Sequence, residues 1–492
     1  MTRKMEPFRH YNLSGGLNTR DANALLRVEE SPDLLNIVLD EKGSVSQRPG
    51  TAKYKSVQVE DAPCTSLYEF SQKDGTTFLL AAAGKHLKKE TEAGWESLKS
   101  DFTEGQHFEF ITNTTIDKCL FVNGKNGYFE YDGTNCVEVT PYSPTEDEIL
   151  EFGLNSIPED PKFILFHKYR VWLAGTTEYP DRVYFCGQSI EGSVLYDYFP
   201  VNYWIRIPNP KGEPVTGMIV YQDRPYIFTR SSIWTVYGDF PDEYHVVKVL
   251  DGVGCIAHRS IREVNGRLFF LGMDGIYMFD GTAISRLSHK IPTEFDAVDR
   301  EKLDRAAAYA MKGNYLLSLP ETENNDYHLN FDADIIEEIY REHGYAFNAW
   351  TRHKGFEALG WLVTREARVL FASPDGYVRE YGVGLNDDGE AIESYIATKD
   401  HSFGLPEQLK RVRRMHLMSS GVSELYYRID FGEWVKFAEV GRRESLVKRI
   451  DIVYPDAPLC SFIAFKFVNN QLNETFTIDG YTLHLIARGI RV

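Results

Sequence analysis

The stretch Phe270–Ser288, FLGMDGIYMFDGTAISRLS, contains two short apolar runs separated by turn residues. Met273-Asp274-Gly275 interrupts the first run, and Asp280-Gly281 follows the second. Asp-Gly between alternating apolar residues is a strong hairpin signal, because glycine accepts the positive φ that a tight turn between twisted strands requires. The stretch therefore predicts a pair of antiparallel strands.

The same pattern recurs along the chain. It is clear in Phe121–Thr140 (FVNGKNGYFEYDGTNCVEVT) and Leu370–Gly382 (LFASPDGYVREYG), and looser in Phe228–Gly238 (FTRSSIWTVYG) and Leu79–Leu87 (LLAAAGKHL). A β unit that cannot bury both of its faces alone, repeated at a regular spacing, is typical of stacked or radial β architectures. We therefore expect a repeat protein built from strands.

The spacing of the repeats favours a propeller. Turn positions recur near Gly84, Gly127, Cys186, Ser232, Gly275, Asn325 and Gly376. The steps average about 50 residues, which suits four-stranded propeller blades with insertions. The pattern predicts an all-β fold with a β-propeller of about seven blades over residues 61–390. The third blade is interrupted by Thr145–Pro161, and the sixth by two expected helices, Thr293–Met311 and Asp332–His343.

The two ends of the chain lack the blade pattern. Residues 1–60 predict an extended arm, with a helical turn at Ser31–Leu39, that lies on the propeller exterior or on a neighbouring subunit. Residues 391–492 predict a separate β-sandwich-like domain. Its expected strands are Leu425–Asp430, Trp434–Val440, Phe462–Val468 and Thr475–Ala487.

Charge is unevenly distributed along the 492 residues, whose formal net charge is −18. Residues 61–390 contain 52 acidic and 31 basic side chains, whereas both ends are nearly neutral. A generic nucleic-acid binder shows the opposite sign. The most basic stretch is Lys410–Leu417 (KRVRRMHL). Alternation along a strand places Lys410, Val412 and Arg414 on one face, and a solvated or subunit-facing strand explains such a run more simply than a phosphate site.

Signals for catalysis, metals and membranes are scarce. The chain has no Gly-x-Ser-x-Gly, Walker or His-Glu-x-x-His motif. Asn123–Gly127 lies in a hairpin turn without a following helix, and Asn386–Glu390 lacks the final glutamate of a calcium loop. The six cysteines are scattered, without a Cys-x-x-Cys pair, which indicates reduced thiols formed in a cytoplasm. No run of about 18 apolar residues and no secretory leader occurs. We expect a non-enzymatic protein without catalytic, cofactor-binding or metal-binding residues.

The N-terminal segment resembles the opening of a family of bacteriophage virion proteins. The resemblance rests on Gly15–Thr19, Asn36–Asp40, Gly43–Val45 and Gln47–Gly50, and in layout it extends to the closing Ile478–Tyr481. These proteins are β-propeller tail components, including the nozzle or hub proteins of short-tailed phages. The resemblance implies a homo-oligomeric ring, commonly sixfold, in the virion tail. The ring would lie below the portal and adaptor proteins and retain and conduct packaged DNA.

Two other functions stay open at this point. One is a tail-associated propeller that binds or cleaves carbohydrate, which needs paired carboxylates or clustered exposed tryptophans at one channel mouth. The other is a cellular propeller scaffold. The seven tryptophans are spread along the chain, as core residues are. For a ring that conducts DNA, the acidic middle of the chain predicts a lumen lined by carboxylates, because such a wall repels the phosphate backbone.

Overall fold

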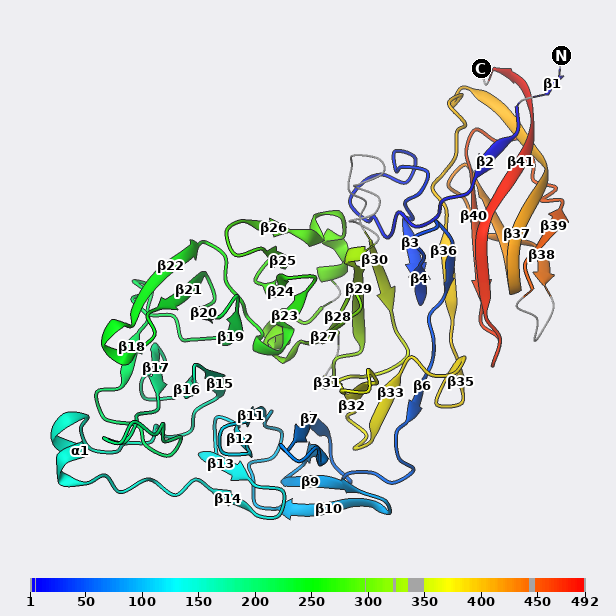
Figure 1. The fold of residues 1–492 in the computed structure, drawn as a ribbon. Helices are drawn as coiled ribbons and strands as arrows, with labels where there is room; N and C mark the ends of the chain where they lie inside the picture. Colours follow the sequence, from blue (N-terminus) through cyan, green and yellow to red (C-terminus); the bar gives the residue numbers. More distant parts are fainter. Residues whose placement is uncertain are drawn as a thin grey trace.

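In a computed structural model, residues 2–4, 6–296, 298–321, 324–334, 349–441 and 447–490 are described. Their strands form seven blades and one further sheet (Figure 1). Each of the first six blades is a four-stranded antiparallel sheet in which strands follow in chain order. This confirms the expected all-β propeller of seven blades.

Blades one to six run from Cys64 to His353. Blade one consists of β7 (Cys64–Ser71), β8 (Thr77–Ala83), β9 (His86–Thr91) and β10 (Gly94–Lys99), and blade two of β11 (Glu109–Asn113), β12 (Lys118–Val122), β13 (Tyr128–Tyr131) and β14 (Cys136–Glu138). Blade three consists of β15 (Phe163–His167), β16 (Arg170–Ala174), β17 (Arg182–Phe185) and β18 (Trp204–Arg206), and blade four of β19 (Gly217–Tyr221), β20 (Arg224–Phe228), β21 (Ser232–Tyr237) and β22 (His245–Asp251). Blade five consists of β23 (Arg262–Val264), β24 (Arg267–Gly272), β25 (Gly275–Phe279) and β26 (Ile284–Arg286), and blade six of β27 (Ala307–Met311), β28 (Asn314–Leu319), β29 (Tyr327–Asp332) and β30 (Trp350–His353).

The first strand of each blade is the innermost. β11 contacts both β7 and β15. In the same way, β27 contacts both β23 and β31 (Gly360–Val363), and β31 contacts β7. These contacts close the ring around a central channel. With one exception, the expected turn positions lie between the second and third strands of their blades or at the first residue of the third strand. Cys186 follows the third strand of its blade, β17, and the corresponding connection there is Gly175–Asp181.

The seventh blade combines distant parts of the chain. β31, β32 (Val369–Ala372) and β33 (Val378–Tyr381) are followed in the sheet by β6 (Thr51–Lys53), and then by β34 (Asn386–Asp387) and β35 (Glu390–Ala391). β6 pairs antiparallel with β33. The N-terminal segment therefore closes the propeller ring by supplying an outer strand to the last blade.

The remaining strands form an eleven-stranded sheet. Its strands are β1 (Thr2–Lys4), β2 (Phe8–His10), β3 (Asp33–Leu35), β4 (Ile37–Leu39), β5 (Val45–Gln47), β36 (Ser394–Ala397), β37 (Gln408–Ile429), β38 (Val435–Gly441), β39 (Arg449–Val453), β40 (Ile463–Asn469) and β41 (Phe476–Ile490). β37 pairs with β39 and β41 over its first half and with β38 and β40 over its second half.

The sheet doubles back on itself along β37. Gly421, between the two halves, has a φ of 73°, and a Cβ there would lie 1.9 Å from the carbonyl oxygen of Thr475. Only glycine fits this position. Leu417 from the first half and Leu425 from the second belong to one buried cluster with Phe465 and Tyr481. This arrangement is sandwich-like, and the segment expected as Leu425–Asp430 is the end of a much longer strand.

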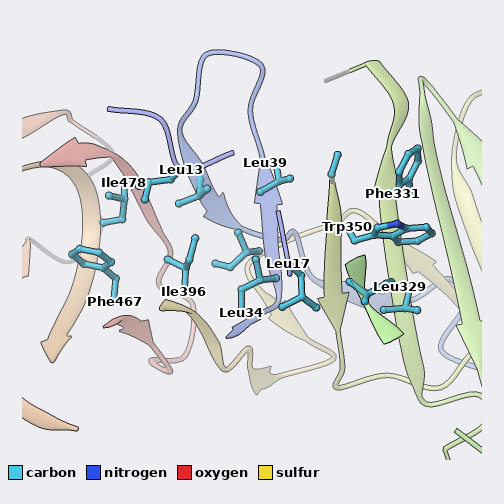
Figure 2. Close-up of a cluster of buried hydrophobic side chains, with 14 of the residues drawn as sticks. Leu13, Leu17, Leu34, Leu39, Leu329, Phe331, Trp350, Ile396, Phe467 and Ile478 are labelled. Atoms are coloured by element: carbon cyan, nitrogen blue, oxygen red, sulfur yellow. The ribbon is translucent and has the colours of Figure 1, made fainter. Parts of the chain in front are cut away.

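Residues 1–60 are not a separate arm. Five of their strands belong to the eleven-stranded sheet and the sixth to the propeller. Leu13 and Leu17 are buried with Trp350 and Leu329 of the sixth blade and with Ile396 and Ile478 of the C-terminal sheet (Figure 2). The N-terminal segment lies between the two parts and joins them through one apolar core, instead of lying on the exterior.

The expected helices are largely absent from the described residues. Ser31–Leu39 forms β3 and β4, because Asn36 adopts a φ of 55° that breaks a helix and Ser31 donates to the carbonyl of Ala397. Thr293–Met311 contains 3₁₀ turns, and it ends in the innermost strand β27. Asp332–His343 lies mostly outside the described residues. The helical elements found are α1 (Glu146–Glu151), η1 (Pro241–Glu243), η2 (His258–Ser260), η3 (Leu287–Lys290), η4 (Pro292–Phe295) and η5 (Arg300–Arg305).

Candidate functional site

A polar cavity of about 350 Å³ lies at one mouth of the propeller channel, where the innermost strands of blades two to six begin. Glu109 is the first residue of β11 and His107 lies just before this strand, and Lys162 directly precedes β15. His258 and Arg259 belong to η2, just before β23. Because a propeller brings the first strands of its blades to one axis, residues far apart in sequence converge here.

The centre of this channel mouth is a cluster of charged and polar groups. Glu109 Oε2 lies 3.3 Å from His258 Nε2. Burial opposes the charge of Glu109, but His258, Arg259 and Arg262 around it hold the pKa of its carboxyl below the ordinary value. Glu109 is therefore ionised at neutral pH. It is poorly suited to act as a general acid, which needs a raised pKa.

Arg259 is held in place by backbone carbonyls. Its guanidinium donates to Leu359 O at 2.7 Å and to Arg305 O at 3.0 Å, and it contacts the ring of His107. Burial lowers the pKa of Arg259 to about 10, so it keeps its charge at neutral pH. Burial and the nearby Arg259 charge hold the pKa of His107 well below its usual range, so this ring is neutral.

Three further cations surround the cavity. Lys162, Arg230 and Arg305 line it and are exposed. None of the three ion-pairs with a carboxylate within the described part of the chain. With Arg259 they face only two acidic lining residues, Glu109 and Asp304. The channel mouth is therefore positively charged, although the propeller as a whole carries a large negative charge.

A second exposed surface lies at the end of the propeller farthest from the C-terminal sheet (Figure 1). It is built on α1, which begins with a capping box between Thr145 and Glu148. The exposed acidic side chains are Glu146, Asp147 and Glu151. Leu150 is 85% exposed, and Leu154, Ile190 and Val201 are also exposed.

Backbone hydrogen bonds hold these side chains together. Val201 N donates to Leu154 O at 2.9 Å, and Ile190 N donates to Glu148 Oε1 at 3.4 Å. Leu150 lies in the last turn of α1, and Leu154 follows shortly after the helix ends at Glu151. We call the group formed by Glu146, Asp147, Leu150, Glu151, Leu154, Ile190 and Val201 the α1 knob. It is acidic and apolar at once, a combination that marks interaction surfaces more often than simple solvation.

The third surface is the outer face of β39, β37 and β41. The expected alternation along Lys410–Arg414 fails, because a β-bulge shifts the register between Val412 and Arg414. As a result Arg413 and Arg414 are both exposed, whereas Lys410 is buried. A bulge adds one residue to its strand and so turns the following side chain to the other face.

Apolar residues extend this basic face along the edge strand. Ile450 is 63% and Tyr454 is 65% exposed, and Ile452 is exposed beside them. A groove of about 580 Å³ is lined by Arg411, Arg413, Arg414, Tyr454, Asp456 and His484 among others. Arg411 pairs with Asp456 at 2.5 Å. We call Arg411, Arg413, Arg414, Ile450, Ile452 and Tyr454 the β39 face. It is basic and apolar, the counterpart of the α1 knob.

Sequence reasoning named only the basic run among these features. The channel mouth was missed because its residues occupy unrelated positions in the sequence. The sequence carries no common signal for them, since Lys162 directly precedes β15 but apolar residues precede most of the other innermost strands. In the described residues no group of three or more His, Cys, Asp or Glu is placed to hold a metal ion. None of the helices described there is long and apolar enough to cross a membrane.

Comparisons with known proteins give distant structural likenesses. No family model and no curated protein matches the sequence. Among solved structures, a catalytically inactive variant of virginiamycin B lyase from Staphylococcus aureus is similar with a TM-score of 0.42 and 12% identity, over 69% of this chain and 99% of that one. YCF48 from Cyanidioschyzon merolae is similar with a TM-score of 0.39 and 10% identity, over 68% of this chain and 98% of that one. The WD40 propeller domain of Doa1 is similar with a TM-score of 0.40 and 10% identity, over 68% of this chain and 97% of that one.

Proposed function

We propose that this chain is a non-enzymatic structural protein of a bacteriophage tail, of the nozzle or hub type near the head–tail connector, and that it forms a homo-oligomeric ring. The N-terminal resemblance supports this role. The joining of propeller and C-terminal sheet by one apolar core supports it as well, because a ring subunit must hold its two contact surfaces at a fixed distance. Adaptor or portal proteins are its proposed neighbours, and viral DNA passes through the ring.

The observation that carries this proposal is the complementarity of the α1 knob and the β39 face. The knob presents Glu146, Asp147 and Glu151 around Leu150, and the face presents Arg413 and Arg414 around exposed apolar side chains. The two surfaces lie at opposite ends of the molecule (Figure 1). A contact between different surfaces of identical subunits is heterologous, and it generates a closed ring when the rotation between subunits closes.

The physical roles of the two components differ. Opposite charges steer the subunits together and fix their orientation, whereas the apolar side chains supply most of the affinity once water is excluded. β39 is an edge strand that pairs only with β37 among the described strands. An exposed edge of this kind is usually covered in the functional assembly.

The test measures the mass of the assembly by light scattering and images it by negative stain. We expect the unchanged protein to form rings. A variant carrying Arg413→Glu and Arg414→Glu, and a second carrying Glu146→Lys, Asp147→Lys and Glu151→Lys, should each be monomeric. The chain that carries both sets should assemble again, because each contact then regains opposite charges.

A matched control reverses exposed charges elsewhere, in Glu92→Lys and Glu104→Lys, and should assemble normally. A monomeric unchanged protein would overturn the ring itself. Rings that persist in both charge-reversed variants would leave the ring standing and overturn the proposed contact.

The carbohydrate-acting alternative receives less support from the geometry. Glu109 contacts His258, and the pKa of the Glu109 carboxyl is lowered, whereas a glycosidase acid requires a raised pKa. No tryptophan is found among the large exposed apolar side chains of the described residues. Soaking the protein with host surface polysaccharide and measuring reducing ends tests this alternative directly.

A further inference from the structure

We propose that the channel mouth is a binding site for a small ligand that carries a phosphate or carboxylate group on a compact apolar body. This inference is independent of ring formation, because all lining residues come from one chain. It starts from the charge balance. Four cations line the cavity against two carboxylates, in a propeller whose sequence carries an excess of acidic residues.

The acidic residues within the mouth offset only part of this charge, since Glu109 and Asp304 both act on Arg259. Glu109 already interacts with His258, and Arg259 and Arg262 act on its charge as well. Lys162, Arg230 and Arg305 come from three different blades, and within the described residues no carboxylate pairs with any of them. Holding like charges around one cavity is unfavourable unless an anion occupies it. The arrangement therefore indicates an anionic ligand.

The cavity also limits the size and character of the ligand. Its volume of about 350 Å³ lies at the lower end of the range of small-molecule sites. A cavity of this volume is too small to admit a nucleic-acid duplex. Phe163, Val215 and Ile256 line it beside the cations. The aromatic ring of Phe163 lies 4.9 Å from the ring of His258 at a tilt of 58°, and it forms one wall of the cavity next to the charged groups.

Arg259 has the most constrained position among the cations. Its two carbonyl contacts and its contact with His107 fix the guanidinium before any ligand arrives. A preorganised cation loses little conformational entropy on binding. The exposed Lys162, Arg230 and Arg305 are free to close on the anion, and they supply charge-assisted hydrogen bonds.

The experiment uses the full chain and phenyl phosphate as the probe, followed by isothermal titration calorimetry at constant ionic strength. Phenyl phosphate should bind more tightly than inorganic phosphate, because its ring reaches the Phe163 wall, and benzyl alcohol should not bind. Comparing the affinity for benzoate with the affinity for phenyl phosphate shows whether the site prefers a carboxylate or a phosphate. Either preference supports an anion site.

Three single variants test whether the ligand binds in this cavity. Lys162→Ala, Arg230→Ala and Arg305→Ala remove exposed side chains, so the fold should be retained, and each should weaken phenyl phosphate binding at least fivefold. Lys42→Ala removes the same charge far from the mouth and should change binding less than twofold. Absence of binding of both phenyl phosphate and benzoate at millimolar concentration would overturn the proposal. So would binding that none of the three variants weakens.

Discussion

At the scale of single residues, Arg48 has the most demanding environment. It is fully buried and forms a two-pronged ion pair with Asp387, with N···O distances of 3.0 and 2.5 Å. Its Nε also donates to Asn36 Oδ1 at 2.8 Å, and Nη2 donates to Lys354 O at 2.8 Å. Arg48 therefore connects the N-terminal segment with both the sixth and the seventh blade.

Arg48→Ala should lower the free energy of unfolding by about 3–5 kcal/mol, because it leaves Asp387 buried without its partner. Chemical denaturation measures this loss. The double variant Arg48→Met with Asp387→Leu should recover much of it, since neither charge then remains buried. As a control, Lys168→Ala removes an exposed ion pair with Asp239 and should cost far less, because solvent screens exposed charges. A loss below 1 kcal/mol in Arg48→Ala would contradict this assignment.

Buried histidines predict a loss of stability in acid. His10 Nδ1 lies 2.8 Å from the hydroxyl of Tyr481, and His401 Nε2 lies 3.2 Å from the same oxygen. Burial lowers the pKa of His10 to about 4 and that of His401 well below its usual range. Since the unfolded chain takes up these protons near pH 6.5, stability is full above that pH and falls as the pH drops toward 4.

The expected slope is at most about 1.4 kcal/mol per pH unit for each histidine that stays neutral in the fold. Urea denaturation at several pH values between 6.5 and 4.5 measures it. His10→Gln keeps a hydrogen-bonding side chain and should reduce the slope by up to about 1.4 kcal/mol per pH unit, the contribution of one proton. An unchanged slope in His10→Gln would show that His10 is protonated within the fold.

At the scale of elements, the sequence predicted hairpins well and long-range pairs poorly. The turn at Met273–Asp274 connects β24 and β25 as expected, because Asp-Gly chemistry is local. The turn near Cys186 was misplaced, since the actual connection, Gly175–Asp181, has no Asn-Gly or Asp-Gly pair. The alanines of β27 favoured a helix, but pairing with β28 outweighs that intrinsic preference.

The closing strand β6 was not predictable from its own residues. Thr51-Ala52-Lys53 has no distinctive alternation, and its partner β33 lies more than 300 positions later in the chain. The β-bulge in β37 was not predictable from the sequence either. Two adjacent arginines read the same whether their side chains lie on opposite faces of a regular strand or are both exposed at a bulge. Pairing partners and bulges are set by the packing of the whole sheet, not by local propensity.

Closure of the seven-bladed propeller by β6 can be tested with a cross-strand disulfide. Ala52 and Glu380 are register partners on β6 and β33, so their side chains lie on the same face of the blade. In the variant Ala52→Cys with Glu380→Cys, oxidation should raise the unfolding temperature. The entropy of closing a long loop limits the gain in the free energy of unfolding to about 5 kcal/mol.

Reduction of the same variant provides the control, because it removes the bond without changing the sequence. The six natural cysteines are free, and five of them are buried, which limits unwanted pairing. If the disulfide forms and the unfolding temperature does not change, the seventh blade is not where unfolding begins.

At the scale of the whole molecule, the charges are segregated. The acidic propeller carries the α1 knob at one end, the basic β39 face lies at the other, and a positively charged cavity occupies the channel mouth. Composition predicted the acidic middle, but the three surfaces depend on residues that only folding brings together. A net charge of −18 per chain multiplies in a ring, so the assembly should present a strongly negative field to any polyanion.

This field predicts how the proposed ring would treat DNA. Each phosphate that a basic side chain neutralises releases counterions and adds affinity, so a conduit with a basic wall would hold the duplex and slow its passage. If acidic side chains line the lumen, duplex DNA should show no measurable affinity for the protein at physiological salt, by fluorescence anisotropy with a labelled duplex. A variant carrying Arg413→Glu and Arg414→Glu should behave identically. Tight, salt-sensitive binding that this variant abolishes would instead assign DNA contact to the β39 face and contradict the proposed conduit.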